Sequence, residues 1–144
     1  GFSRDEFARS HPGGALGRKL LTHVRDVMRT GDGAPRVADT ATLSDAILEM
    51  SRGRMGITAV LDRNQQVIGI FTDGDLRRHM RPDLITALVD DIMTKDPKTI
   101  GPDLLASEAL EILNSRKITA LMVTEGKKPV GILRLHDILQ AGVA

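Results

Sequence analysis

Two aspartates in closely similar contexts are the first candidates for chemistry in this sequence. Asp75 ends the segment Gly69-Ile70-Phe71-Thr72-Asp73-Gly74-Asp75, and Asp137 ends the segment Gly131-Ile132-Leu133-Arg134-Leu135-His136-Asp137. A carboxylate offers two acceptor oxygens and no donor, which suits the paired hydroxyls of a sugar. The alternative is structural, because an acid at the start of a helix accepts hydrogen bonds from otherwise unpaired amides. The sequence leaves both interpretations open.

The two segments differ three residues before the aspartate. Thr72 can offer its hydroxyl to a phosphate, although a β-branched residue is also common at the end of a strand. Arg134 stands at the same place in the second segment. It can pair with a phosphate or a carboxylate through two parallel hydrogen bonds, or it can be a solvated charge at the end of a strand. The two segments therefore need not bind the same ligand.

The composition excludes several classes of protein. The chain has 144 residues and a formal net charge of +1, whereas non-specific binding of nucleic acid needs a clear excess of cationic side chains. There is no cysteine, and the four histidines show no metal-ligand spacing, so we expect no metal site and no cofactor. No apolar run approaches the roughly 20 residues that span a bilayer, and no signal peptide is visible. We therefore expect a cytoplasmic protein without a membrane partner.

An internal repeat must position the two aspartates. Four pairs of segments match in the same order, 61 to 65 residues apart. They are Val27-Met28 with Ile92-Met93, Leu43-Ser44-Asp45-Ala46 with Leu105-Ala106-Ser107-Glu108, Ile57-Thr58-Ala59 with Ile118-Thr119-Ala120, and Val67-Ile68-Gly69-Ile70 with Pro129-Val130-Gly131-Ile132. Four ordered matches at nearly constant spacing indicate a duplicated unit.

The residue pattern of each copy predicts elements in the order strand, helix, strand, strand, helix. The runs 42–52 and 105–116 are rich in Ala and Leu and predict helices, and further helices are expected near 73–80 and 135–141. The runs 57–61, 67–71, 118–123 and 129–133 are rich in Val and Ile and predict strands, after short extended pieces near Arg36-Val37 and Thr99-Ile100. One copy is too small to bury both faces of its sheet. We therefore expect an α+β fold in which two βαββα units pack face to face with pseudo-two-fold symmetry.

These patterns divide the chain into four parts. The first repeat is expected at 24–80 and the second at 89–144, with a connector at 81–88. Residues 1–23 lie outside the repeat, are rich in glycine and predict a linker.

The duplicated unit resembles a tandem pair of cystathionine-β-synthase (CBS) domains over about residues 24–141. The segment that ends in Asp75 fits the family motif in full, and the segment that ends in Asp137 departs from it at Arg134. The resemblance implies that each aspartate accepts hydrogen bonds from the ribose hydroxyls of a nucleotide. It also implies that each cleft takes its aspartate from one repeat and its base contacts from the other.

The resemblance implies two sets of ligand-binding residues. Thr72, Thr94, Lys98, Ile118 and Thr119 would join Asp75, whereas Arg134, Thr30, Arg36, Ile57 and Thr58 would join Asp137. Lys98 and Arg36 would be the counter-charges of an anionic ligand, or they are ordinary surface charges. Ile118 and Ile57 would line the base, or they are buried core residues.

A second resemblance covers Ser10-His11-Pro12-Gly13-Gly14-Ala15-Leu16-Gly17-Arg18-Lys19-Leu20-Leu21 together with residues 69–78. These segments are similar to the C-terminal part of bacterial D-arabinose 5-phosphate isomerases, which join a sugar isomerase (SIS) domain to a CBS pair. The family interconverts D-ribulose 5-phosphate and D-arabinose 5-phosphate, the first step towards the lipopolysaccharide sugar Kdo. The SIS domain is absent, so we expect a regulatory fragment that is not an enzyme alone. His11 would act as an acid/base group only in the full-length parent.

The resemblance leaves the ligand open. CMP-Kdo, the activated end product of the pathway, is one candidate regulatory nucleotide, and AMP and ATP are others. The expected partners are the parent's own SIS domain and further copies of the chain. The alternative is a structural module that holds the parent oligomer together and has no functional ligand.

Overall fold

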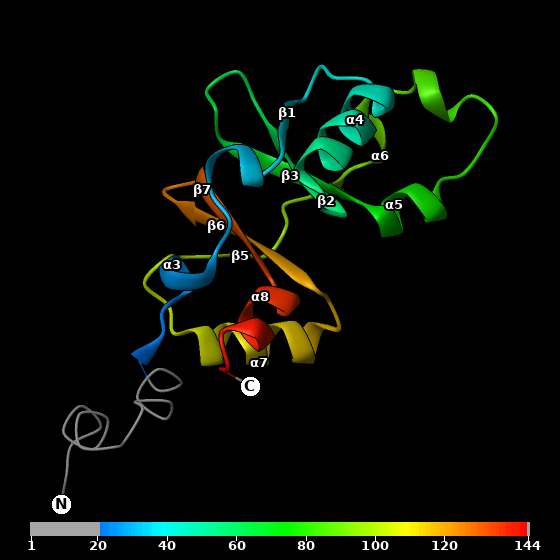
Figure 1. Ribbon diagram of the computed structural model, residues 1–144. Helices are drawn as coiled ribbons and strands as arrows, with labels where there is room; N and C mark the ends of the chain where they lie inside the picture. Colours follow the sequence, from blue (N-terminus) through cyan, green and yellow to red (C-terminus); the bar gives the residue numbers. More distant parts are fainter. Residues whose placement is uncertain (1–20, 144) are drawn as a thin grey trace, which may run out of the picture.

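The computed structural model describes residues 21–143, so His11 and most of the 1–23 linker lie outside the described residues. Its strands are β1 (Arg36–Ala38), β2 (Ile57–Leu61), β3 (Val67–Thr72), β4 (Thr94–Lys95), β5 (Thr99–Ile100), β6 (Ala120–Glu125) and β7 (Lys128–Arg134). Its helices are α3 (Val24–Val27), α4 (Leu43–Gly53), α5 (Asp73–Arg78), α6 (Val89–Ile92), α7 (Ala106–Arg116) and α8 (Leu135–Gln140), with 3-10 turns η1 (Gly31–Gly33) and η2 (Leu84–Thr86). Figure 1 shows two sheets stacked with helices on their outer sides.

The strands form two sheets of similar topology, which confirms the predicted pair of α+β units. One sheet has the order β1-β2-β3-β4 and the other the order β5-β6-β7. In each sheet the first strand runs parallel to the second, and the second and third strands form an antiparallel hairpin. The helix between the first and second strands supplies the crossover that a parallel pair requires.

Three apolar clusters hold the fold together. One lies in the first repeat around Leu43, Val60 and Phe71. A second lies in the second repeat around Leu113 and Leu133. The third cluster lies between the two sheets and contains Met55, Ile57, Ala59, Leu61, Met122 and Ile132. Each sheet therefore buries one face against its own helices and the other face against its partner sheet.

Helix α4 shows how the local sequence sets an element of the unit. The Thr42 side chain accepts a hydrogen bond from the Asp45 amide, and the Asp45 side chain accepts one from the Thr42 amide. This reciprocal capping box satisfies two amides that the first turn leaves unpaired. Leu43, Ala46 and Met50 then recur at helical spacing and form the buried face. The helix ends at Arg54, which adopts the left-handed conformation.

The two repeats exchange the short helices that precede them. Val24 of α3 lies in the core of the second repeat, and its amide donates to the carbonyl oxygen of Leu104 at 2.8 Å. Val89 of α6 lies in the core of the first repeat, and its amide donates to the carbonyl oxygen of Ala41 at 2.9 Å. In Figure 1, α3 accordingly lies beside α7 and α8, and α6 lies beside α4. Neither short helix was predicted from the sequence.

Two glycines allow the exchanged segments to approach the sheets closely. A Cβ atom at Gly69 would lie 2.4 Å from Met93 Sδ and 2.9 Å from the Thr94 carbonyl oxygen. A Cβ atom at Gly131 would lie 2.7 Å from Met28 Sδ and 2.8 Å from the carbonyl oxygen of Arg29. The glycine of each motif therefore contacts the methionine near the start of the other repeat: Gly69 contacts Met93, and Gly131 contacts Met28.

The structure corrects one of the repeat matches. Arg54 and Lys117 both close their helices in the left-handed conformation and are 63 residues apart. Ile57 pairs with Thr72 in the first sheet, and Ala120 pairs with Arg134 in the second. Ile57 is therefore equivalent to Ala120, and the match of Ile57-Thr58-Ala59 with Ile118-Thr119-Ala120 is wrong by two residues. A shift of two keeps every side chain on the same face of a strand, so the pattern alone did not reveal it.

Candidate functional site

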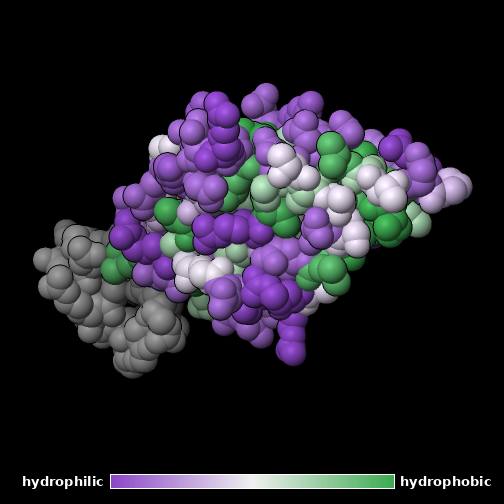
Figure 2. Space-filling model, turned by 90° about the horizontal axis from the view of Figure 1, so that it is seen from above, coloured by the Kyte–Doolittle hydropathy of each residue, from purple (hydrophilic) through white to green (hydrophobic). Residues whose placement is uncertain are grey.

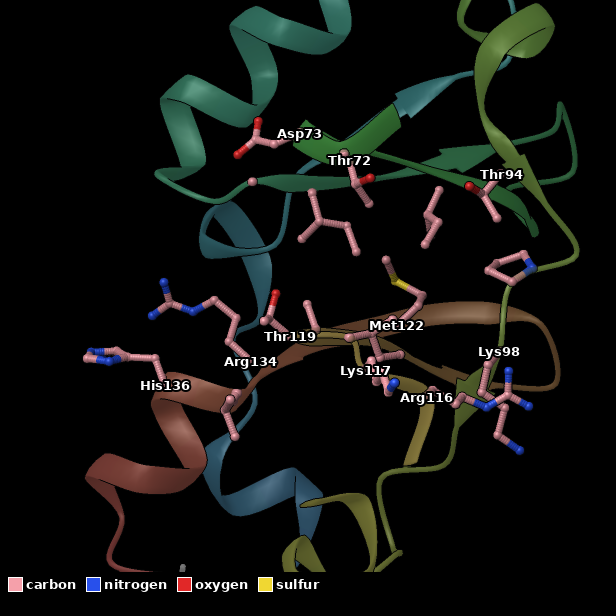
Figure 3. A pocket seen from close by; sticks show the side chains of 18 of the residues that line it. Thr72, Asp73, Thr94, Lys98, Arg116, Lys117, Thr119, Met122, Arg134 and His136 are labelled. Atoms are coloured by element: carbon pink, nitrogen blue, oxygen red, sulfur yellow. The ribbon is translucent and has the colours of Figure 1, made fainter. Parts of the chain in front are cut away.

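A cavity of about 850 Å³ lies between the two repeats. It has the size of a small-molecule site. Figure 3 shows its lining, with Thr72 and Thr94 of the first sheet facing Met122 of the second sheet and Thr119, which directly precedes β6. Its inner wall is apolar and contains Ile57, Ile70, Ala120 and Met122, which belong to or pack against the cluster between the sheets.

The cavity brings together the residues predicted around Asp75, with one exception. Thr72, Thr94, Lys98, Ile118 and Thr119 all line it, and Ile57 and Arg134 of the other predicted set line it as well. The exception is Asp75, which is 2% exposed and lies behind the cavity wall. The structure therefore mixes the two predicted sets in one cavity.

Asp75 already has protein donors at both carboxylate oxygens. Oδ2 accepts from the amide of Thr72 at 3.0 Å and from its hydroxyl at 3.1 Å. Oδ1 accepts from the hydroxyl of Thr94 at 3.0 Å and from Arg78. The Thr72 hydroxyl also accepts from the Asp75 amide, so these two motif residues form the capping box of α5. A ligand hydroxyl must replace one of these donors to reach the carboxylate.

Asp137 occupies the equivalent position in the second repeat but has arginine partners. Arg134 donates to its carboxylate from Nε at 2.9 Å and from Nη2 at 2.8 Å, and Arg29 donates from Nη2 at 3.3 Å. The hydrogen bonds from Arg134, and then that from Arg29, hold the pKa of the Asp137 carboxyl below its ordinary value, although burial opposes them. The same contact raises the pKa of Arg134.

Two partners of Asp75 correspond to the two partners of Asp137, and Arg78 is an additional partner of Asp75. Thr94 lies beside Ile70 at the edge of β3, and Arg29 bridges Ile132 of β7 with backbone hydrogen bonds of 2.8 and 2.9 Å. Each exchanged segment therefore delivers one donor to the aspartate of the repeat on which it packs. The first repeat uses two threonines where the second uses two arginines.

The rest of the set predicted around Asp137 is dispersed. Arg36 lines a separate hollow of about 10 Å³, which has room for about one water molecule. Thr30 is exposed and does not line that hollow, although the adjoining Gly31 does. Thr58 is fully buried, and its hydroxyl donates to the carbonyl oxygen of Ala59 at 3.2 Å. Within residues 21–143, the hollow at Arg36 is too small for a nucleotide, and neither Thr30 nor Thr58 lines it.

Several cavity residues were not predicted from the sequence. Cationic side chains dominate among them: Arg77, Arg116 and Lys117 line the cavity together with Lys98 and Arg134, against a single acid, Asp73. His136 lines it as well. The signal for Arg116 and Lys117 was their place at the end of α7, directly before the predicted Ile118. Such a wall favours an anionic ligand.

The described residues contain no group of three or more His, Asp or Glu that could hold a metal ion. Among residues 21–143, no helix is both long and apolar enough to cross a membrane.

Comparisons with known proteins agree with the repeat and the fold. The family described as "CBS domain" matches residues 24–82 and 89–144. The chain is 50% identical over 145 residues to arabinose 5-phosphate isomerase KdsD of Escherichia coli K12, and 48% identical over 146 residues to that of Pseudomonas aeruginosa. These alignments cover 99% of this chain but only 44% and 45% of the relatives, so the chain spans less than half of their length.

Solved structures show the same fold at low identity. CBSX2 in complex with AMP superimposes with a TM-score of 0.73 at 22% identity, covering 85% of this chain and 96% of that one. The CBS domain pair of MJ0100, in complex with 5-methylthioadenosine and S-adenosyl-L-methionine, superimposes with a TM-score of 0.74 at 18% identity, covering 83% and 94%. With both repeats matched by the family, this chain belongs to the CBS-domain family and carries a tandem pair of its domains.

Proposed function

We propose that this CBS pair is the nucleotide-binding regulatory part of a larger arabinose 5-phosphate isomerase. The observation that carries the proposal is the cavity of about 850 Å³ between the repeats, with five cationic side chains and one acid in its wall. A phosphate or carboxylate gains from such a wall, and the apolar inner side suits a base or sugar ring. The AMP and the S-adenosyl compounds bound by two structural neighbours support a nucleoside-containing ligand.

The names of the relatives support the enzyme class of the parent. In this proposal the parent interconverts D-ribulose 5-phosphate and D-arabinose 5-phosphate in a SIS domain outside this chain. His11 would serve there as an acid/base group, and the CBS pair would report on a ligand. CMP-Kdo, AMP and ATP are the candidates, and the ribose hydroxyls would replace Thr94 or Arg78 as donors to Asp75.

The binding step is tested by isothermal titration of the chain with CMP-Kdo, CMP, AMP and ATP. Replacement of Lys98 by Gln (K98Q) is expected to weaken the best ligand about tenfold, because a charge-assisted contact is lost. Arg63 lies in the exposed β2–β3 turn outside the cavity, so Arg63→Gln is the matched control. Failure of all four compounds to bind at millimolar concentration would overturn the proposal.

The regulatory step needs the full-length parent. A ligand regulates only if it binds two states of the enzyme with different affinity. Isomerase activity of the full-length protein is therefore expected to change with ligand concentration, and the change is expected to weaken in the Lys98→Gln variant. Activity that is constant at saturating ligand would leave a binding site without a regulatory role.

One observation favours a structural role as a second candidate. Leu48 and Met80 of the first repeat and Ile85 of the connector are 66%, 69% and 59% exposed. Figure 2 looks down on this repeat and shows apolar patches within a mainly hydrophilic surface. Self-association of the chain would cover such side chains. In sedimentation experiments this role predicts a dimer that Ile85→Ser weakens, and a monomer at all concentrations would contradict it.

A further inference from the structure

Cationic side chains lie at both ends of the cavity. Figure 3 shows Arg134 at one end and Lys98 with Arg116 at the other. Thr119, Met122 and Lys117 lie between them in the same view. Apolar and hydroxyl-bearing side chains therefore share the middle of the cavity with one lysine, and further cations stand at both ends.

Among residues 21–143, the Arg134 end carries one more cation than anion. Asp137 is 9% exposed and is the single carboxylate of this part of the chain that both Arg134 and Arg29 contact. Two guanidinium groups on one carboxylate leave one positive charge in excess. The corresponding Asp75 has one charged partner, Arg78, and otherwise amide and hydroxyl donors, so its surroundings are balanced.

Arg134 also keeps donors for a ligand. Its hydrogen bonds to Asp137 use Nε and Nη2, and within residues 21–143 Nη1 has no protein acceptor. The side chain is 23% exposed and lines the cavity. Asp137 thus fixes the guanidinium while one of its edges stays available. An arginine held in this way loses little rotamer freedom when an anion binds.

We propose that the cavity binds one ligand with two separate anionic groups, one held by Arg134 and the other by Lys98 and Arg116. An uncharged ring system would bridge them over Ile57, Ile70 and Met122. The inference rests on the proposed nucleotide-binding function and narrows its ligand class to nucleotides that carry a second anionic group away from the phosphate. The proposal assigns one ligand to this cavity, a stoichiometry of one per chain, and the hollow beside Arg36, at about 10 Å³, is too small for a second such ligand.

Three matched probes separate the ligand classes. Adenosine carries no anionic group, AMP carries a phosphate, and adenylosuccinate carries the phosphate of AMP with two carboxylates at the far edge of the purine. Titration of the chain at low salt is expected to give adenylosuccinate about tenfold tighter binding than AMP, and AMP tighter binding than adenosine. The advantage of adenylosuccinate should shrink as salt is added, because salt screens charge pairs at an open site.

Two variants test the assignment of the ends. Of Arg134→Gln and Lys98→Gln, the variant at the end that holds the carboxylates should reduce the advantage of adenylosuccinate over AMP, the variant at the phosphate end should weaken both ligands alike, and Arg63→Gln should leave both affinities unchanged. Lys98 forms no ion pair with any of residues 21–143, so the Lys98 variant remains informative even if Arg134→Gln does not fold.

The outcomes separate this inference from the proposed function. Equal or weaker binding of adenylosuccinate than of AMP would overturn the two-anion ligand and leave nucleotide binding in place. An undiminished advantage in both variants would overturn the two assigned ends. Two ligands per chain would overturn the stoichiometry. No binding of any nucleotide would overturn this inference and the proposed function together.

Discussion

At the scale of single residues, the aspartate that ends the motif has mainly neutral partners in the first repeat and charged partners in the second. Asp75 is held by Thr72 and Thr94 and by one arginine. Asp137 is held by Arg134 and Arg29. The exchange of two hydroxyls for two guanidinium groups turns a capping contact into an ion cluster. The carboxylate of Asp137 is therefore held by ion pairs with two arginines. A ligand donor at Asp75 would have to replace only a neutral protein donor.

Asp137 is expected to make the stability of the chain depend on acid pH. Its folded pKa is lowered by Arg134, so its contribution is complete above the unfolded value of about 4 and is lost as pH falls through the folded pKa. Asp137→Asn should therefore lower the free energy of unfolding at pH 7, and this difference should shrink below about pH 4. Urea denaturation between pH 2.5 and pH 7 measures it.

The variant is needed because Glu49, paired with Arg52, also has a lowered pKa. The acid dependence of the wild type alone contains both carboxyls, whereas the difference between wild type and variant isolates Asp137. A difference that stays constant across the pH range would show that the carboxylate charge is not what stabilises this cluster.

At the scale of elements, the two exchanged segments rest on glycines in the middle of a hairpin strand. Gly69 and Gly131 are where β3 and β7 meet the chain that leads into the other repeat. The main-chain oxygens of Thr94 and Arg29 lie too close to these positions for any side chain. The motif glycine thus positions the segment that carries a donor to each aspartate.

Gly69→Ala and Gly131→Ala are each expected to lower the free energy of unfolding by about 1–3 kcal/mol, the usual effect of overpacking. A Cβ atom at either position would press on a backbone oxygen and a methionine sulfur. Gly101→Ala is the control, because a Cβ atom there meets nothing within 4 Å. Urea denaturation compares the three variants, and an unchanged midpoint for both hairpin variants would show that the segments can shift without loss.

Most elements were predictable from the sequence, and the reasons for the failures are physical. The runs that became α4 and α7 carry helical spacing, those that became β2 and β3 are short and rich in Val and Ile, and all four predicted bounds differ from the observed ones by one residue or none. The four-residue helices α3 and α6 are too short to show a period, and they are stabilised by the opposite repeat. Long-range packing of that kind leaves no local signal.

The candidate site was predictable to a similar degree. Thr72, Thr94, Lys98, Ile118 and Thr119 converge in one cavity as expected. Asp75 lies behind the cavity wall because Thr72 and Thr94 donate hydrogen bonds to its carboxylate in place of a ligand. Residue spacing does not encode these rotamers and donors. Of the second predicted set, Arg36 lies at a hollow of about 10 Å³ beside Gly31 of η1, whereas Arg134 lines the larger cavity, and spacing along the chain does not encode this separation.

At the scale of the whole molecule, the hydrophobic core of each repeat contains residues from the other repeat. The first needs α6 and the second needs α3, and the cluster around Met122 belongs to both sheets. Each repeat has a helix of the other repeat in its core, so unfolding of one repeat removes part of the core of the other. The chain should therefore behave as one cooperative body.

Three methionines report on the three apolar clusters: Met28 packs against the second-repeat core, Met50 lies in the first-repeat core, and Met122 lies between the sheets. Methyl NMR signals of the three are expected to change at the same urea midpoint. Met122→Ala should lower the free energy of unfolding by about 2–5 kcal/mol and shift all three signals together. Separate midpoints for Met28 and Met50 would contradict a single cooperative unit.

The exchange of α3 and α6 also sets an order of events during synthesis. The ribosome makes the chain from its N-terminus, and domains generally fold as their parts emerge. The first repeat has every part of its core once Ile92 has left the exit tunnel. Val24 is made earlier but must wait for Leu113, Leu133 and Ile138, so its apolar surface stays uncovered longest. Helix α3, which is synthesised early, is thus among the last described segments to pack into its core.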